Sequence, residues 1–138
     1  MRGLTIRGSG SSHETIDAGV SLGKAAERAA IDDNHLIGNL YGIDIHGARD
    51  AHVIGNVIEG RQDHRVNDRG NGIYVWNSPG AIVEGNSVRW GRDGIFSNTS
   101  RKGTYRNNLF RDLRFAVHYM HTHTSEISGN VSIGNNLG

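Results

Sequence analysis

The chain is built from short runs in which apolar and polar residues alternate. Each run follows a small residue, and apolar side chains occupy the first position after it and, apart from Ser97, the third. Alternation with a period of two predicts a strand with one buried face. Four such runs begin after Gly42, Gly72, Gly94 and Ala116. A second kind of segment, rich in small and apolar residues, ends in an asparagine at Asn34, Asn56, Asn86, Asn108 and Asn130.

The spacing between these two signatures is regular. Each run is followed 14 residues later by its asparagine, and most runs begin 8 residues after the preceding asparagine. An earlier copy begins at Gly19 with a spacing of 15 residues. The repeat unit is therefore 22 residues long, which is too short for a pair of helices. It predicts an all-β protein, a right-handed single-stranded parallel β-helix with about six coils.

Residues at fixed distances before each asparagine support this interpretation. A bulky column lies three residues before it, at Ile31, Val53, Val83, Tyr105 and Ile127. A small column lies five residues before it, at Ala29, Ala51, Ala81, Gly103 and Ser125. We expect both columns to point inward, and we expect the asparagines to stack in a turn. Each asparagine is able to take a left-handed conformation and to bond to those above and below.

One repeat is longer than the others. The distance from Asn56 to Gly72 is 16 residues, which is 8 more than the usual spacing. The excess falls in a polar stretch near residues 61–68, so we expect a surface loop there. We interpret residues 1–138 as a single β-helix segment. Both ends resemble cuts through a stack, and this predicts a fragment of a longer β-helix.

Composition removes several classes of protein. The sequence contains 20 glycines and one proline, as expected for many turns between strands that need their N–H groups. It has no cysteine, which excludes a disulfide scaffold and thiolate ligands. A net charge of +1 does not favour a nucleic acid partner. The apolar runs are too short for membrane insertion, and residues 1–4 show no signal peptide.

The outward positions of the strands carry the most informative side chains. The second and fourth residues after each small residue point away from the core if the first and third point inward. These positions hold a candidate partner or ligand face, composed of Asp44, His46, Tyr74, Trp76, Phe96 and Asn98. Exposed aromatic rings are costly, so we expect this face to bind something or to be covered by a structural neighbour.

A second group of candidates follows in the sequence. His118 and Met120 fall on the outward side of one strand, and His121 and His123 come at the next turn. Imidazole suits copper and zinc, and a thioether selects Cu(I), so these four residues are candidate metal ligands. The alternative is a strand end rich in solvated histidines.

Catalysis by this fold has also to be considered. Polysaccharide lyases and epimerases use the outward face of a β-helix, where Asp44, His46, Tyr74 and Trp76 would form part of a sugar groove. The loop pair Asp63 and His64 offers acid and base groups, although a charged, solvated loop is the better explanation for it. Acids are sparse on the face, and Asp93 is expected near a turn. We therefore assign no catalytic residue.

Five stretches resemble a known family. They are WGRDGIFSNTS at residues 90–100, RDLRFAVHYM at 111–120, NGIYVWN at 71–77, SEISGNVSIGN at 125–135 and GLTIRGSG at 3–10. The run from Trp90 to Met120 is the most specific of them. Together they resemble the NosD family of periplasmic copper-binding proteins, whose members are longer than this chain.

The resemblance implies a periplasmic, non-enzymatic role in maturing nitrous oxide reductase. It implies an ABC-type ATPase and its membrane subunit as partners, and a copper chaperone lipoprotein that delivers copper. It also places His118 and Met120 in a segment typical of the family and suggests transiently bound copper. Two alternatives from other classes remain. One is a carbohydrate-active β-helix, of the uronate epimerase or polysaccharide lyase type, and the other is a scaffold whose outer face binds only protein.

Overall fold

The computed structural model describes residues 1–63, 65–121 and 124–136 of the chain. These residues form sixteen short strands and one 3-10 helix, η1 (Val66–Asp68). None of the described segments is a helix with the length and apolar character needed to cross a membrane.

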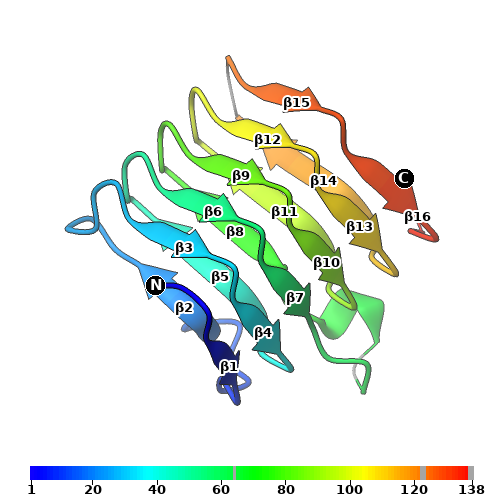
Figure 1. Ribbon diagram of the computed structural model, residues 1–138. Coiled ribbons are helices and arrows are strands. Elements are labelled where there is room, and N and C mark those ends of the chain that lie inside the picture. The colour runs from blue at the N-terminus through cyan, green and yellow to red at the C-terminus, as the bar shows by residue number, and fades with distance from the viewer. Residues whose placement is uncertain (64, 122–123, 137–138) are drawn as a thin grey trace.

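The strands belong to three parallel sheets, which wind around one axis (Figure 1). The first sheet contains β1 (Thr5–Arg7), β4 (His35–Ile37), β7 (Val57–Glu59), β10 (Ser87–Arg89), β13 (Leu109–Arg111) and β16 (Val131–Ile133). The second contains β2 (Ala18–Leu22), β5 (Tyr41–His46), β8 (Ile73–Trp76), β11 (Asp93–Asn98) and β14 (Phe115–Met120). The third contains β3 (Ala30–Asp32), β6 (His52–Ile54), β9 (Ile82–Glu84), β12 (Thr104–Arg106) and β15 (Glu126–Ser128).

The chain visits these sheets in strict rotation, as Figure 1 shows from the blue N-terminus to the red C-terminus. Strand β1 comes first, and five complete coils of three strands follow it. The predicted right-handed single-stranded parallel β-helix is therefore confirmed. The six strands of the first sheet account for the estimate of about six coils.

The register between coils shows where residues have been added. Val83 pairs with Tyr105, 22 positions along, whereas Val53 pairs with Val83, 30 positions along. The additional residues lie between β7 and β8, where η1 is found. Ile6 and Leu36 are also 30 positions apart, and there all but one of the additional residues lie between β1 and β2. Both additions thus fall in the connection from the first sheet to the second.

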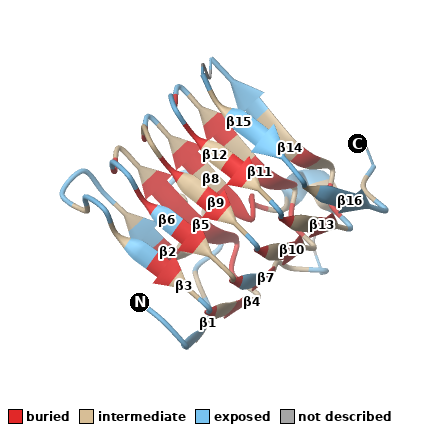
Figure 2. Ribbon diagram, turned by 45° about the horizontal axis from the view of Figure 1, so that its top comes forward, coloured by how far each residue is buried: buried red, intermediate tan, exposed pale blue. Residues whose placement is uncertain are grey.

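The interior is filled by the inward columns that the alternation predicts. In the second sheet Ile43, Ile73 and Ile95 are fully buried, and each pairs with the next. The third sheet adds Val53 and Val83, also fully buried. Figure 2 shows this burial concentrated in the central coils, while β15 and β16 in the last coil are exposed.

Gly94 interrupts the alternation at the start of β11. A Cβ atom placed on it would lie 2.4 Å from Cδ1 of the buried Phe110, so this position faces the interior. Ile95 also faces the interior. With two successive inward positions, the preceding residue, Asp93, is directed to the outward side of the sheet, where it contacts His118.

The asparagines form the predicted stack at the turn between the third and first sheets. Nδ2 of Asn56 donates to Oδ1 of Asn86 at 3.0 Å, and Nδ2 of Asn86 donates to Oδ1 of Asn108 at 3.0 Å. The backbone N–H groups of Asn56 and Asn86 donate to the same two oxygens. Each carboxamide oxygen thus accepts two hydrogen bonds, and the buried side chains are satisfied. We call this stack the asparagine ladder.

The ladder asparagines do not use the left-handed conformation that they are able to take. The left-handed residue is the one before each of them, with positive φ at Asp33, Gly55, Gly85, Asn107 and Gly129. The ladder residues are not among the described residues with positive φ. The turn needs one left-handed residue to change direction. The next residue is then extended and sends its side chain inward, where it can bond to its neighbours.

Candidate ligand face and histidine–carboxylate pair

The register brings the predicted outward residues together on the second sheet. Asp44 pairs with Tyr74, Tyr74 with Phe96, and Phe96 with His118. In the adjacent column His46 pairs with Trp76, and this column continues through Asn98 to Met120. We call these residues the outward face. It consists of Asp44, His46, Tyr74, Trp76, Phe96, Asn98, His118 and Met120.

Aromatic rings on the outward face stack along the axis of the solenoid. The rings of Tyr74 and Phe96 are nearly parallel, with centroids 5.5 Å apart. His46 stacks on Trp76 at 4.3 Å, and Tyr41 meets Tyr74 edge to face at 6.1 Å. Such pairs stabilise beyond the area that they bury. The face is therefore an ordered surface, held by contacts between coils.

Asp44 is a buried carboxyl group within these rings. Only 7% of the residue is exposed, and its Oδ1 lies 3.7 Å from Nδ1 of His46. That distance is too long for a hydrogen bond, and neither atom has another partner among the described residues. Burial raises the pKa of Asp44, although the neighbouring His46 opposes the rise. Burial also raises the pKa of Tyr74, and the charge of Asp44 adds to that effect.

Asp93 anchors a second polar group, at the end of the outward face nearest β14. It is fully buried, and its two oxygens accept hydrogen bonds from Nε and Nη2 of Arg114 at 3.0 and 2.9 Å. Nδ1 of His118 lies 3.1 Å from Oδ2 of the same carboxylate. Asp93 was not among the predicted site residues, because the strand pattern put it near a turn. The inward-facing glycine that follows is the signal that would have revealed it.

The pairing with Asp93 fixes the chemistry of the His118 ring. A carboxylate held by an arginine fork accepts hydrogen bonds and has none to donate, so Nδ1 of His118 is the donor. The lone pair of a neutral imidazole then resides on Nε2. The ring is also packed against Phe96 at 4.7 Å and Phe115 at 5.0 Å. Its orientation is therefore set before any ligand arrives.

The other predicted metal ligands follow His118 in the chain. Met120 is the next outward residue of β14, and 43% of it is exposed. His121 comes directly after the strand, is exposed, and has a φ of 49°. His123 lies outside the described residues. Within the described part of the chain, no group of three or more histidine or acidic side chains is placed to hold a metal ion. The four-residue copper site stays a prediction.

The added segment between β1 and β2 and the added segment between β7 and β8 meet beside the outward face. Nε and Nη1 of Arg61 donate to the carbonyl of Gly38 at 2.9 Å and to Oγ of Ser11 at 2.9 Å. His13 bridges the hydroxyl of Tyr41 at 3.0 Å and the carbonyl of Asp68 at 2.8 Å. A pocket of about 420 Å³ lies at this junction. Of the candidate acid–base pair in this region, Asp63 is exposed and His64 lies outside the described residues.

Comparisons with known proteins show the family to which the chain belongs. The family model described as "Periplasmic copper-binding protein (NosD)" matches residues 54–138. A "Probable ABC transporter binding protein NosD" from Stutzerimonas stutzeri is 43% identical over 94 residues, which are 68% of this chain and 22% of that protein. The protein of the same name from Pseudomonas aeruginosa is 38% identical over 94 residues, with the same coverage. The chain thus spans about a fifth of the length of these relatives. It belongs to the NosD family, which is described as periplasmic and copper-binding.

Proposed function

We propose that this chain is part of a periplasmic accessory protein that helps to assemble the copper–sulfur site of nitrous oxide reductase. In this role it receives copper from a chaperone lipoprotein and works with an ABC-type ATPase and its membrane subunit. The family description and the relatives' names support copper binding and an ABC transporter partner. The chain itself carries out no chemical reaction in this proposal.

The observation that carries the proposal is the hydrogen bond between His118 and Asp93. Histidines that bind metals usually donate their second ring N–H to a carboxylate or a carbonyl, which sets the tautomer and the orientation of the ring. His118 has this arrangement, with a buried carboxylate at 3.1 Å and a side chain that is 31% exposed. Nε2 is thus the atom that we assign to copper.

Copper is cargo in this proposal, so its ligands must also release it. Met120 supplies a soft thioether on the same side of β14, and His121 and His123 follow it in the sequence. Thioether and imidazole ligands suit Cu(I), and partly exposed ligands allow exchange with those of a partner. The copper would pass from one protein to the next by stepwise replacement of these ligands.

A titration with Cu(I) in the presence of a competing chelator tests the proposal. We expect sub-micromolar binding that is lost in the His118→Ala, Met120→Ala double variant. His52→Ala is the matched control, because His52 is an exposed histidine on the third sheet. Unchanged binding in the double variant would reject the site, as would an equal loss in the control.

Asp93→Asn tests whether Asp93 positions His118. An amide can donate to Nδ1, which disturbs the tautomer while preserving size. We expect Cu(I) affinity to fall by roughly 10-fold to 100-fold, the usual effect of losing such a partner. A circular dichroism spectrum identical to that of the wild type would show that the β-helix survives. Wild-type affinity in this folded variant would mean that Asp93 serves only Arg114.

A second candidate function is carbohydrate binding on the outward face. The observation that favours it is the buried Asp44 beside the stacked rings of His46 and Trp76, because a carboxyl with a raised pKa can donate a proton. A uronate or an oligosaccharide would bind over these rings, and Trp76→Ala would abolish the binding. No binding to a panel of glycans would reject this function.

A further inference from the structure

The turns that join the second sheet to the third carry a series of cations. Lys24 and Arg28 follow β2, Arg49 follows β5, and Arg101 and Lys102 follow β11. Throughout the part of the chain that the structure describes, none of these five side chains forms an ion pair. Several arginines elsewhere are paired with acids, for example Arg89 with Asp112 at 3.3 Å and Arg106 with Glu84 at 3.2 Å.

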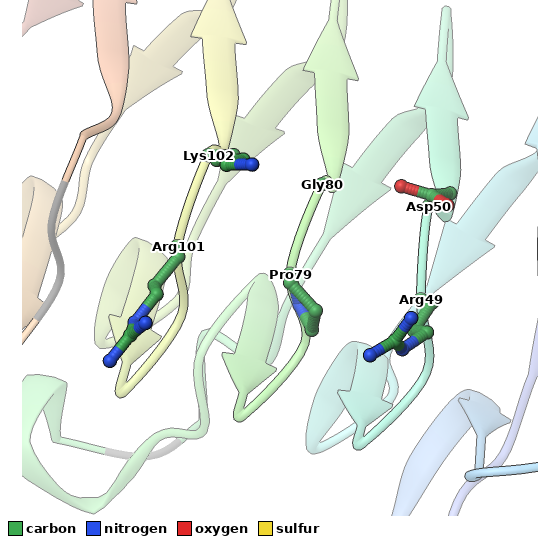
Figure 3. Close-up of a pocket in the computed structure, with 6 residues that line it drawn as sticks. All are labelled: Arg49, Asp50, Pro79, Gly80, Arg101 and Lys102. Atoms are coloured by element: carbon green, nitrogen blue, oxygen red, sulfur yellow. The ribbon is translucent and has the colours of Figure 1, made fainter.

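A pocket of about 430 Å³ opens between these turns, as Figure 3 shows. It is lined by Arg49, Asp50, Pro79, Gly80, Arg101 and Lys102. The turns are held in line by two backbone hydrogen bonds. The N–H of Asp50 donates to the carbonyl of Pro79 at 3.0 Å, and the N–H of Gly80 donates to the carbonyl of Arg101 at 2.9 Å. The middle turn carries no cation, so it forms a gap between two cationic coils.

A second pocket of about 330 Å³ shares Arg49 and Pro79 with the first and adds Lys24 and Glu27. The two pockets therefore adjoin and form one groove across the turns of four successive coils. Strands in a sheet lie about 4.8 Å apart, so the groove is about 14 Å long. We call it the cationic groove.

We propose that the cationic groove docks an extended acidic segment of a partner protein. The length of the groove corresponds to about four residues of extended chain at roughly 3.3 Å each, whereas a single phosphate ion would contact only one step of it. Guanidinium groups match carboxylates in shape as well as in charge. The groove is lined by four cations, Lys24, Arg49, Arg101 and Lys102, and by two acids, Glu27 and Asp50, which leaves an excess of two positive charges.

The two acids argue for a peptide over an anionic membrane. Asp50 lies against Gly80, where an added Cβ atom would clash with its carboxylate, so a negative charge stands inside the pocket. A uniform anionic surface would be repelled there, while a segment with separated carboxylates can place them opposite Arg49 and Arg101. None of the proposed copper ligands that the structure describes lies in the cationic groove. The docking proposal and the copper proposal can therefore fail independently.

Binding of a fluorescein-labelled hexaglutamate peptide, followed by fluorescence anisotropy at low salt, tests the proposal. We expect the Arg49→Glu, Arg101→Glu double variant to bind at least about tenfold more weakly than the wild type. Arg7→Glu is the control, because Arg7 is an exposed arginine on the first sheet, away from the groove. Its affinity should stay within about twofold of the wild type.

Three further measurements make the result decisive. The neutral variant Arg49→Gln, Arg101→Gln should also bind the peptide more weakly. This shows that the loss comes from removing the positive charges and not from repulsion by the introduced glutamates. Cu(I) affinity should be the same in all these variants, which separates this proposal from the copper site. Equal peptide binding by the double variant and the wild type would overturn the proposal. It would also be overturned if phosphatidylglycerol vesicles or inorganic phosphate bound the groove more tightly than the peptide.

Discussion

The two faces of the second sheet are made by the same strands but have different sequence patterns. The inward side has almost the same residue in every coil, namely Ile43, Ile73, Ile95 and Val117. The outward side changes from coil to coil, through Asp44, Tyr74, Phe96 and His118. Each inward residue meets similar neighbours above and below, so one solution recurs. Outward residues also contact the adjacent coils, but they do not have to fill a closed interior. Their identity can therefore vary from coil to coil, and specific chemistry can be placed there.

The largest difference between the two faces is expected when the same charge is placed on each side of one strand. Ile73→Asp puts a charge into the fully buried column, and we expect a loss of about 4 kcal/mol or more in the free energy of unfolding. Tyr74→Asp places the same charge on the adjacent outward position, where water can reach it, and should cost far less. Urea denaturation followed by circular dichroism measures both. Equal losses would show that the two faces are packed alike.

The asparagine ladder provides the next largest effect. In Asn86→Ala, the N–H and Nδ2 of Asn56 lose their acceptor, and Oδ1 of Asn108 loses a donor. Buried groups left without partners should reduce the free energy of unfolding by about 3 kcal/mol.

Asn98→Ala is the matched change on the outward face. The side chain of Asn98 accepts a hydrogen bond from the adjacent Thr99 on the exposed side, so this variant should lose less than about 1 kcal/mol. Thermal unfolding of the two variants under identical conditions makes the comparison. Similar melting temperatures would mean that the ladder contributes little to stability.

The smallest expected effect concerns the pH dependence of stability. Burial raises the pKa of Asp44 above its ordinary value of 3.8, so the folded state holds this proton more tightly than the unfolded state. Stability therefore falls as pH rises from that value through the raised pKa, and the deficit persists at neutral pH. Asp44→Asn should thus be more stable than the wild type at pH 7, and the difference should close below about pH 4.

Asp17 offers a control of opposite sign. A hydrogen bond from the Thr15 side chain, together with one from the Ser12 backbone, lowers the pKa of Asp17. Asp17→Asn should therefore be less stable than the wild type at pH 7, and this deficit should vanish as pH falls through the lowered pKa. Urea denaturation at several pH values tests both variants. The same sign in both would contradict the assigned environments.

The fold could be predicted because the residue types recur with the 22-residue period of the coils. A spacing of 14 and 8 residues places strands, and it identifies the inward columns and the stacked asparagines. The left-handed turn residue could not be located in this way. Asp33, Gly55 and Asn107 share little chemistry apart from their tolerance of positive φ. The conserved feature of the turn is the backbone, which the sequence specifies only loosely.

The candidate site was predicted only in part. His118 and the rings of the outward face follow directly from the alternation of the strands. Asp93 does not, because its direction depends on two successive inward positions at Gly94 and Ile95. The junction of Arg61 with the first added segment was also beyond sequence reasoning, since it joins residues 50 positions apart without any repeat to relate them.

The asparagine ladder and the added segments lie at different corners of the solenoid. Insertions into the chain therefore have different consequences at the two corners. At the ladder corner a change in length must be a whole coil of 22 residues, because any other number breaks the line of carboxamides. The corner between the first and second sheets accepts extra residues, as the two register steps of 30 positions show. That corner adjoins the outward face through His13 and Tyr41. New loops can be inserted at this corner to change what the outward face recognises, while the register between the coils is preserved.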